Sequence, residues 1–285
     1  PPIQLGPTKA PIKFTQVEPV FLSDETMLER KNKVMQGMVD GGFDALVIYA
    51  DKEHGGNFEY LTGFIPRFEE GLLIIDASGH CTVILGNENL KLARFSRVPV
   101  TLLHCPLFSL PNQPMDHETP LEDLLASAGL SDKAKVGLVG WKMFTPAAGN
   151  GSAYFDIPYF IVDAVKRTLR KEAELLNAAH VFIGGENGAR VTNNANEIAH
   201  YEYGANLASN CIIDALDAVE VGVREVELGA LLAAEGQYNT VVSIAATGAR
   251  FDHANLYPGY KKVQQGDPLS LTTGFKGGLS SRAAF

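Results

Sequence analysis

Residues 266–285, GDPLSLTTGFKGGLSSRAAF, decide how the second half of the chain folds. They predict a tight turn at Gly266 and Asp267, a buried strand over 268–273, a glycine-rich turn and a second strand. Glycine supplies permissive backbone angles, and an aspartate side chain can accept from backbone amides beside it. We therefore expect a β-hairpin in which Asp267 is a turn residue and not a metal ligand.

Composition limits the class of protein. The chain has 285 residues, 46% of them hydrophobic and 20% charged, which is typical of a soluble protein with room for two domains. Its net charge of −9, without a cluster of Lys or Arg, disfavours nucleic-acid binding. No apolar run reaches the roughly 18 residues that a membrane span needs. We expect a cytoplasmic protein with no membrane contact.

The cysteines and the first N-terminal residues support the same expectation. Cys81, Cys105 and Cys211 lie far apart, with no CxxC or Cys/His metal spacing. They are expected to be reduced thiols, as is usual inside cells. Residues 1–14 contain no hydrophobic stretch of the kind that a secretory signal carries.

Strands alternate with helices in the first half of the chain. A helix is predicted to begin at Ser23, a capping residue before acidic neighbours, and to end at Gly41 and Gly42. The run FDALVIYA, residues 43–50, predicts a strand buried on both faces. The other predicted strands are 71–77, 81–85, 98–103 and 135–140, the predicted helices are 87–94 and 120–128, and 158–169 is left open between strand and helix. This alternation predicts an α/β domain over residues 1–185.

The pattern changes after about residue 185. Apolar residues recur at helical spacing over 194–219, and Gly222 ends this long helix. A second helix is predicted over 223–234, and strands over 241–245 and 268–273. The polar stretch 184–196 is the best linker, so the second domain is placed at 186–285.

Four segments, in this order, resemble one superfamily. They are GFDALV at 42–47 with NFEYLTGF at 57–64, Arg190 with NEI at 196–198, GVREVEL at 222–228, and the segment from Gly248 to Asp267. The chain is similar to the creatinase, prolidase and aminopeptidase P superfamily. The resemblance implies a creatinase-type α/β N-terminal domain followed by an α+β catalytic domain of the pita-bread fold. It also implies a homodimer. The residues after 190 leave room for only the first half of the catalytic domain, so we expect that domain to continue beyond residue 285, the alternative being that another chain supplies its second half.

The hairpin departs from the usual chemistry of that superfamily. The resemblance implies two aspartates here that bind a divalent metal pair, which makes a bridging water nucleophilic. The first position holds Thr272, and the second falls at Ser280, Ser281 or Arg282. Hydroxyl groups and a cation do not replace the carboxylate oxygens that such metals prefer. The sequence therefore predicts no metal ligands and no cofactor.

The metal-free creatinase branch resembles the hairpin more closely, through Leu269-Ser270-Leu271. Creatinase implies a histidine that acts as general acid or base on a water. His253 is the candidate catalytic residue, although an ungapped count back from Gly266 places Asn255 at the corresponding position. Asn255 could bind substrate but could not transfer a proton. An exposed loop histidine is the competing interpretation of His253.

Two arginines and a threonine complete the candidate site. Arg67 could bind a substrate carboxylate across a dimer interface, because a guanidinium matches a carboxylate. Arg282 could attract an anionic substrate group or form a structural ion pair. Thr272 is the third candidate substrate-binding residue.

Three functions follow from these residues. The first is a creatinase-like, metal-independent hydrolase of a C–N bond in a small, carboxylated amide or guanidino compound. The second is a non-catalytic binding member of the superfamily. The third is a metallopeptidase of the Xaa-Pro aminopeptidase type, which the missing aspartates disfavour.

Overall fold

The computed structural model describes residues 6–7, 9, 11–116, 118–147, 149–254, 257–276 and 278–284. Contacts divide the chain into two compact units, Ser23–Asn193 and a second unit that combines Pro1–Leu22 with Asn194–Phe285. The predicted boundary after residue 185 therefore falls a few residues before the break between the units. Residues 1–22, which the sequence placed in the first domain, belong by their contacts to the second unit.

The unit Ser23–Asn193 is built on a six-stranded mixed sheet with the order β4-β3-β2-β1-β5-β6. The strands are β1(Ala45–Ala50), β2(Gly71–Asp76), β3(Cys81–Leu85), β4(Thr101–His104), β5(Lys135–Val139) and β6(Glu174–Asn177). Strand β1 pairs antiparallel with β2 on one side and parallel with β5 on the other. All six of its residues are buried, as predicted for a central strand.

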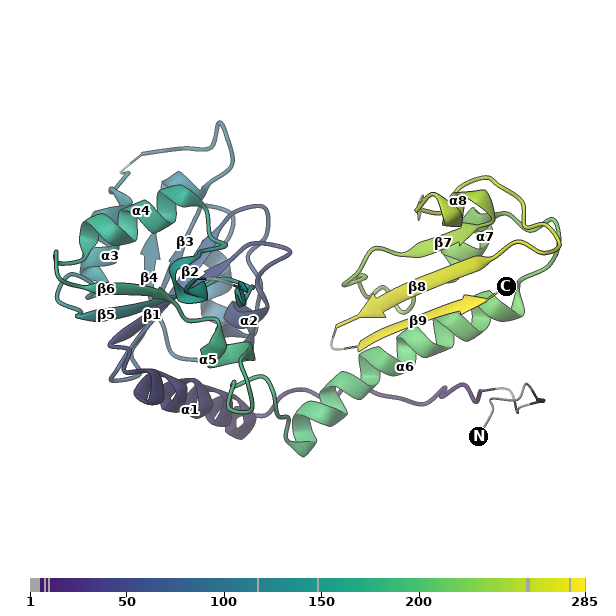
Figure 1. Ribbon diagram of the computed structural model, residues 1–285, viewed down its shortest axis with the longest axis horizontal. Helices are drawn as coiled ribbons and strands as arrows, with labels where there is room; N and C mark the ends of the chain where they lie inside the picture. The colour runs from purple at the N-terminus through teal and green to yellow at the C-terminus, as the bar shows by residue number, and fades with distance from the viewer. Residues whose placement is uncertain are drawn as a thin grey trace. The chain divides into compact units, whose positions relative to one another are not determined.

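Helices cover both faces of this sheet, as Figure 1 shows. They are α1(Asp24–Gly41), α2(Gly56–Thr62), α3(Leu121–Ser127), α4(Tyr159–Thr168) and α5(His180–Ile183), with 3₁₀ turns η1(Leu90–Phe95), η2(Pro106–Phe108) and η3(Gly151–Ala153). Side chains of α1, α2 and α5 form one core with the sheet, and those of α3 and α4 form another. The predicted α/β architecture is therefore observed.

Helix α1 begins and ends at the capping residues that the sequence predicted. Ser23 accepts a hydrogen bond from the amide of Thr26 and caps the helix. Gly42 ends it in the left-handed conformation, with φ of 65°. Both features agree with the predicted start and end.

Other elements differ from their predictions. The helix expected at 87–94 is the 3₁₀ turn η1, and the strand expected at 98–103 is limited to β4. Strand β6 was missed, because among its four residues only Asn177 is buried and no alternation appears in the sequence. The open segment 158–169 is helix α4, in which buried Val165 follows the buried pair Ile161 and Val162 at spacings of four and three residues.

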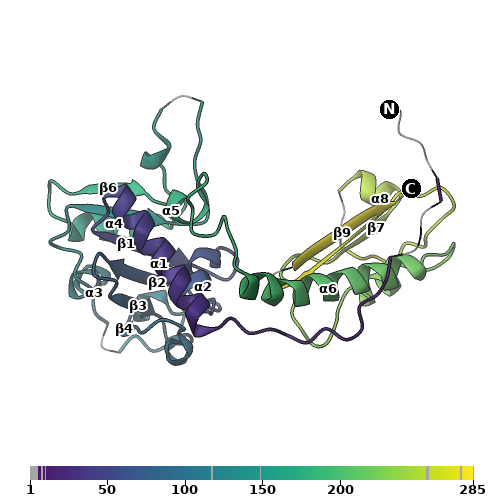
Figure 2. The ribbon, with the colours of Figure 1, turned by 90° about the horizontal axis from the view of Figure 1, so that it is seen from below.

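The second unit packs one long helix against a three-stranded sheet of order β7-β8-β9 (Figure 2). Its elements are α6(Ala195–Asp217), α7(Glu225–Ala230), β7(Ile244–Thr247), α8(Ala249–Asp252), β8(Leu269–Phe275) and β9(Gly278–Ala284). The core joins Leu207, Cys211 and Ile212 of α6 to Leu269 and Leu271 of β8. The long helix and the hairpin were both predicted.

Residues 11–22 form an extended arm along α6 (Figure 2). Asn210 binds the backbone of Phe14 twice, accepting from its amide at 3.2 Å and donating to its carbonyl at 2.7 Å. Lys13 forms an ion pair with Asp214. Contacts of this kind explain why the arm belongs to the second unit.

Among the described residues, no helix combines the length and the apolar composition that a membrane crossing requires. Cys81, Cys105 and Cys211 are buried free thiols, as predicted. Burial raises the pKa of Cys105 to about 11 and keeps this thiol protonated near neutral pH.

Candidate functional site

The β8–β9 hairpin aligns the two positions that the sequence compared with metal ligands. Thr272 pairs with Ser281, whereas Arg282 lies opposite Leu271. Of the three positions left open for the second ligand, Ser281 is therefore the one directly across from Thr272. Thr272 is half-buried. Its neighbours along β8, Leu271 and Thr273, are both buried.

Thr273, next to the candidate Thr272, has a structural role. It is fully buried, donates its hydroxyl to the carbonyl of Leu232 at 2.8 Å and accepts from Asn239 at 2.7 Å. A buried hydroxyl whose donor and acceptor functions are both used in hydrogen bonds is not available for catalysis. The hairpin therefore presents Thr272, and not Thr273, as its candidate polar side chain.

His253 follows α8 directly and is exposed. Its Nδ1 lies 2.7 Å from the carbonyl oxygen of Ala249, and because a carbonyl only accepts, Nδ1 carries the proton. In the neutral ring the lone pair is then on Nε2, as a general base requires. Asn255, the competing candidate for this position, lies outside the described residues, so the choice between the two stays a prediction.

Arg67 belongs to the other unit, in the segment between α2 and β2. Its side chain is exposed, and its backbone amide donates to Asn89 at 2.8 Å. Asn89 is fully buried and also donates to the carbonyl of Arg67 at 2.9 Å. The backbone of Arg67 is thus fixed while its guanidinium remains available. The substrate-binding roles of Arg67 and Arg282 stay predictions.

Sequence reasoning missed a buried carboxylate beneath the His253 segment. Glu225, at the start of α7, has no exposed surface and accepts four hydrogen bonds. Two come from Thr247, from its amide at 2.7 Å and its hydroxyl at 2.9 Å. Arg250 donates at 2.7 Å and the amide of Gly259 at 3.0 Å. Glu225 therefore ties together both ends of the segment that carries His253.

Lys261 extends the hydrogen-bond network around Glu225. It forms an ion pair with Asp267 and donates to the hydroxyl of Thr247 at 3.0 Å. The Lys261 hydrogen bond holds the pKa of Asp267 below its ordinary range. Asp267 also accepts from the amide of Gln264 at 2.9 Å, as expected of a turn residue. The one sequence signal for Glu225 was its place at a helix start, which is typical of capping and does not indicate burial.

A divalent metal pair does not fit the hairpin. Thr272 and Ser281 are neutral hydroxyl residues where the superfamily pattern needs two carboxylates. In the part of the chain that the structure describes, no group of three or more His, Cys, Asp or Glu side chains could hold a metal ion.

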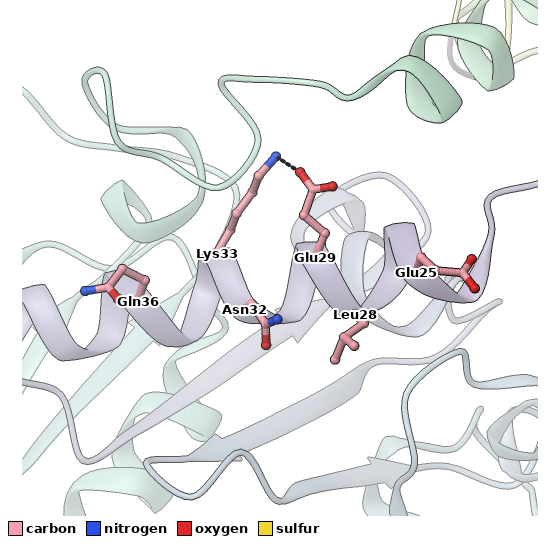
Figure 3. A pocket seen from close by; sticks show the side chains of 6 residues that line it. All are labelled: Glu25, Leu28, Glu29, Asn32, Lys33 and Gln36. Carbon is pink, nitrogen blue, oxygen red and sulfur yellow. Dashed lines mark ion pairs between the residues drawn. The ribbon is translucent and has the colours of Figure 1, made fainter.

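Two hollows in the described surface are lined by other residues than these. A shallow depression of about 440 Å³ runs along α1 and is shown in Figure 3. It is lined by Glu25, Leu28, Glu29, Asn32, Lys33 and Gln36, among which Lys33 and Glu29 form an ion pair at 3.0 Å. A second depression, of about 400 Å³, is lined by residues of α3 and α4. Neither contains a predicted site residue.

Comparison with known proteins identifies the fold. No family model and no curated protein matches the sequence. Among solved structures, the Xaa-Pro dipeptidase from Bacillus anthracis is 17% identical, with a TM-score of 0.60 over 90% of this chain and 64% of its own. The prolidase from Pyrococcus furiosus is 18% identical, with a TM-score of 0.62 over 89% and 69%. The dipeptidase PepE from Mycobacterium ulcerans is 16% identical, with a TM-score of 0.63 over 92% and 65%.

These similarities show a shared fold. The chain spans about 64% of the length of the Bacillus anthracis protein. That partial coverage agrees with the prediction of part of a pita-bread domain.

Proposed function

We propose that this chain, which has the fold of the prolidases and Xaa-Pro dipeptidases, acts as a hydrolase on the C–N bond of a small peptide-like substrate. The observation that carries the proposal is the shared fold, since the similar structures are named as peptidases. The sequence ranked an amidino substrate of the creatinase kind first. The named structures reverse that order and favour a peptide bond.

The chemistry of the site favours a reaction in which His253 is the general base. Its Nδ1 is held by the carbonyl of Ala249, which leaves Nε2 to accept a proton from water. The Glu225 network holds Thr247 and Arg250 before His253 and Gly259 after it, which gives the imidazole a defined support. Thr272 would then contact substrate at a position where the superfamily pattern has a metal-binding carboxylate.

Arg282 would bind an anionic group of the substrate, such as a dipeptide carboxylate. We further propose a homodimer, as the resemblance to the superfamily implies, in which the exposed Arg67 of a second copy would bind a substrate carboxylate across the interface. Sedimentation equilibrium of the purified protein measures this, and a monomer at micromolar concentration would contradict it.

The test is hydrolysis of Xaa-Pro dipeptides and of creatine by the purified protein, with EDTA or with added Mn²⁺. We expect dipeptide turnover that persists in EDTA. His253→Ala should lower kcat by about 100-fold or more, the usual contribution of a general base. His80→Ala, at an exposed turn, is the matched control and should leave turnover unchanged.

Each other outcome supports a different function. Turnover that requires Mn²⁺ and is unaffected by His253→Ala would support the metallopeptidase alternative. Turnover of creatine alone would restore the creatinase-like function. No turnover of any substrate would support the non-catalytic binding protein.

A further inference from the structure

The carboxyl ends of β1 and β5 form a switch point in the six-stranded sheet (Figure 1). These two strands are parallel neighbours. The chain leaves β1 for α2, which packs on one face of the sheet, and leaves β5 for α4, which packs on the opposite face. In open α/β sheets, ligands bind in the crevice where successive connections diverge in this way. The residues just after β1 and β5 therefore merit a search for a site.

The segment after β5 is held rigidly by its neighbours. Asn57, which is buried, donates to the carbonyl of Gly140 at 2.7 Å. Asp156 accepts from the amides of Trp141 and Lys142, each at 2.7 Å. Asn177 donates to the carbonyl of Lys142 at 3.3 Å. The backbone from Gly140 to Lys142, with Trp141 at its centre, is thus held by side chains from three other segments.

The indole of Trp141 is nevertheless open to solvent. Trp141 is 50% exposed, although the imidazole of His54 stacks on one side of its ring, with centroids 5.0 Å apart and planes at 26°. Half of the Trp141 surface therefore stays available to a ligand. Exposed tryptophan rings, which offer a large aromatic surface and a polar N–H, are frequent anchors at binding surfaces.

His54 is held in place by Asp51. The two carboxylate oxygens lie 2.9 and 3.0 Å from Nδ1 of the imidazole, so Nδ1 donates and Nε2 is left as the outward group. Asp51 also accepts from the hydroxyl of Tyr49 at 3.2 Å and from the amide of Glu53 at 2.8 Å. Burial by itself would raise the pKa of Asp51. The hydrogen bonds from His54 and from the amide of Glu53 outweigh that effect, so the pKa is lowered overall.

The groups around the indole favour positive charge. The indole face has negative potential, and Asp51 is an ionised carboxylate. Burial raises the pKa of Glu70, and the charges of Asp51 and Glu69 raise it further, so a cation beside Asp51 would relieve repulsion among these carboxylates. Two basic residues lie next to these groups in sequence: Lys142 lies over Phe144, 5.1 Å from the ring centroid, and Lys52 is exposed.

We propose that Trp141, with His54 and Asp51 behind it, binds a planar nitrogen cation of the guanidinium or amidinium class. The flat cation would stack on the exposed part of the indole, where cation–π attraction and the planar shape of the cation both favour contact with the ring. This site belongs to the unit Ser23–Asn193 and is independent of His253 and of the proposed hydrolysis.

Trp141 is the only tryptophan in the chain, so it provides an unambiguous probe. Methylguanidinium would be titrated into the ¹⁵N-labelled protein while the single indole N–H signal is followed by NMR. Methylurea, a planar neutral analogue, and methylammonium, a cation that is not planar, are the comparison ligands. We expect a saturable shift with methylguanidinium, and weaker binding of both comparison ligands by about 2-fold to 30-fold, the range of a cation–π contact.

Variants separate the site from general surface binding. Trp141→Ala, followed through ligand signals by saturation-transfer NMR, should remove the preference for methylguanidinium. Tyr159→Ala, which truncates an aromatic residue that is 78% exposed on α4, should keep it. Circular dichroism confirms that both variants are folded. Equal response to the three ligands, no saturable shift, or an unchanged preference in Trp141→Ala would each overturn the proposal.

Discussion

A single buried carboxylate organises the part of the second unit that carries His253. On burial, the Glu225 carboxylate loses its hydrogen bonds to water. Four protein donors, one of them the charged Arg250, replace them. A buried charge is tolerated only when it is paired and hydrogen-bonded in this way. The cost of removing the charge should therefore be high, because Arg250 and two backbone amides would lose their acceptor.

Glu225→Gln tests this at the residue scale. An amide keeps the shape but loses the charge and part of the accepting capacity, so the free energy of unfolding should fall by about 3 kcal/mol. Urea denaturation followed by circular dichroism measures the change. Glu227→Gln is the matched control, since Glu227 is an exposed residue of the same helix paired with Arg224. Equal effects of the two substitutions would contradict the role of Glu225.

At the scale of elements, the turn between β7 and α8 depends on one glycine. Gly248 has φ of 54° and ψ of −133°, which side chains rarely permit. A Cβ at this position would also overlap the carboxylate of Asp267. Backbone geometry and packing both require glycine where the strand passes into the helix that precedes His253.

Gly248→Ala should therefore destabilise the protein more than an ordinary left-handed glycine substitution. Gly236→Ala is the control, because Gly236 has φ of 67° and open space around its Cα. We expect about 1 kcal/mol for Gly236→Ala and at least about 2 kcal/mol more for Gly248→Ala, measured as the free energy of unfolding in urea. Similar losses at both sites would show that the overlap with Asp267 is relieved without cost.

Asp44 holds the start of β5 against β1. Its carboxylate accepts from the amides of Lys135 at 3.0 Å and Ala134 at 2.8 Å, and these bonds lower its pKa. A lowered pKa stabilises the folded state above the ordinary aspartate pKa, and that stability is lost as the pH falls through the folded value.

The prediction is that Asp44→Asn reduces the loss of stability on acidification. At about pH 6 the carboxylate is ionised in both states, whereas about pH 3 lies below the ordinary aspartate pKa, where the unfolded chain is protonated and the stability from Asp44 is being lost. The wild type should lose more stability across this interval than the variant. Asp40→Asn controls for net charge, since Asp40 accepts from the Gln36 side chain at the exposed end of α1. The same pH dependence in wild type and Asp44→Asn would refute the assignment.

For the whole molecule, the two units have separate cores. The unit Ser23–Asn193 buries both faces of its sheet with its own helices. Its last residues contribute to that packing: the hydroxyl of Tyr60 donates to the carbonyl of Ala189 at 2.7 Å, and Arg190 donates to Asn57 at 2.7 Å. Such a unit meets the conditions for folding alone.

A fragment of residues 23–193 should accordingly unfold in one cooperative transition, followed through Trp141 fluorescence. A fragment of residues 23–185 lacks the Ala189 and Arg190 bonds and should be less stable by about 2–4 kcal/mol, the contribution of two buried hydrogen bonds with their packing. Equal stability of the two fragments would place the boundary where the sequence predicted it. Failure of the longer fragment to fold would show that the units are interdependent.

Local patterns were sufficient for much of the fold. Ser23 and Gly42 mark the ends of α1, the continuous apolar run of β1 indicates a central strand, and Gly266-Asp267 marks the hairpin, because capping, burial and turn chemistry act between residues close in sequence. The four-residue β6 and the 3₁₀ turn η1 were not predictable in the same way, since neither has enough residues to show a period.

The sequence by itself determined that the hairpin carries hydroxyl residues in place of aspartates, because this depends on residue types alone, and its resemblance to the superfamily implied the fold of the prolidases. Only the tertiary structure decided that Ser281 lies opposite Thr272, that Glu225 supports the His253 segment, and that His54 stacks on Trp141. These relations join residues far apart in the chain. They depend on strand register and on the meeting of separate loops, which no local pattern of side chains specifies.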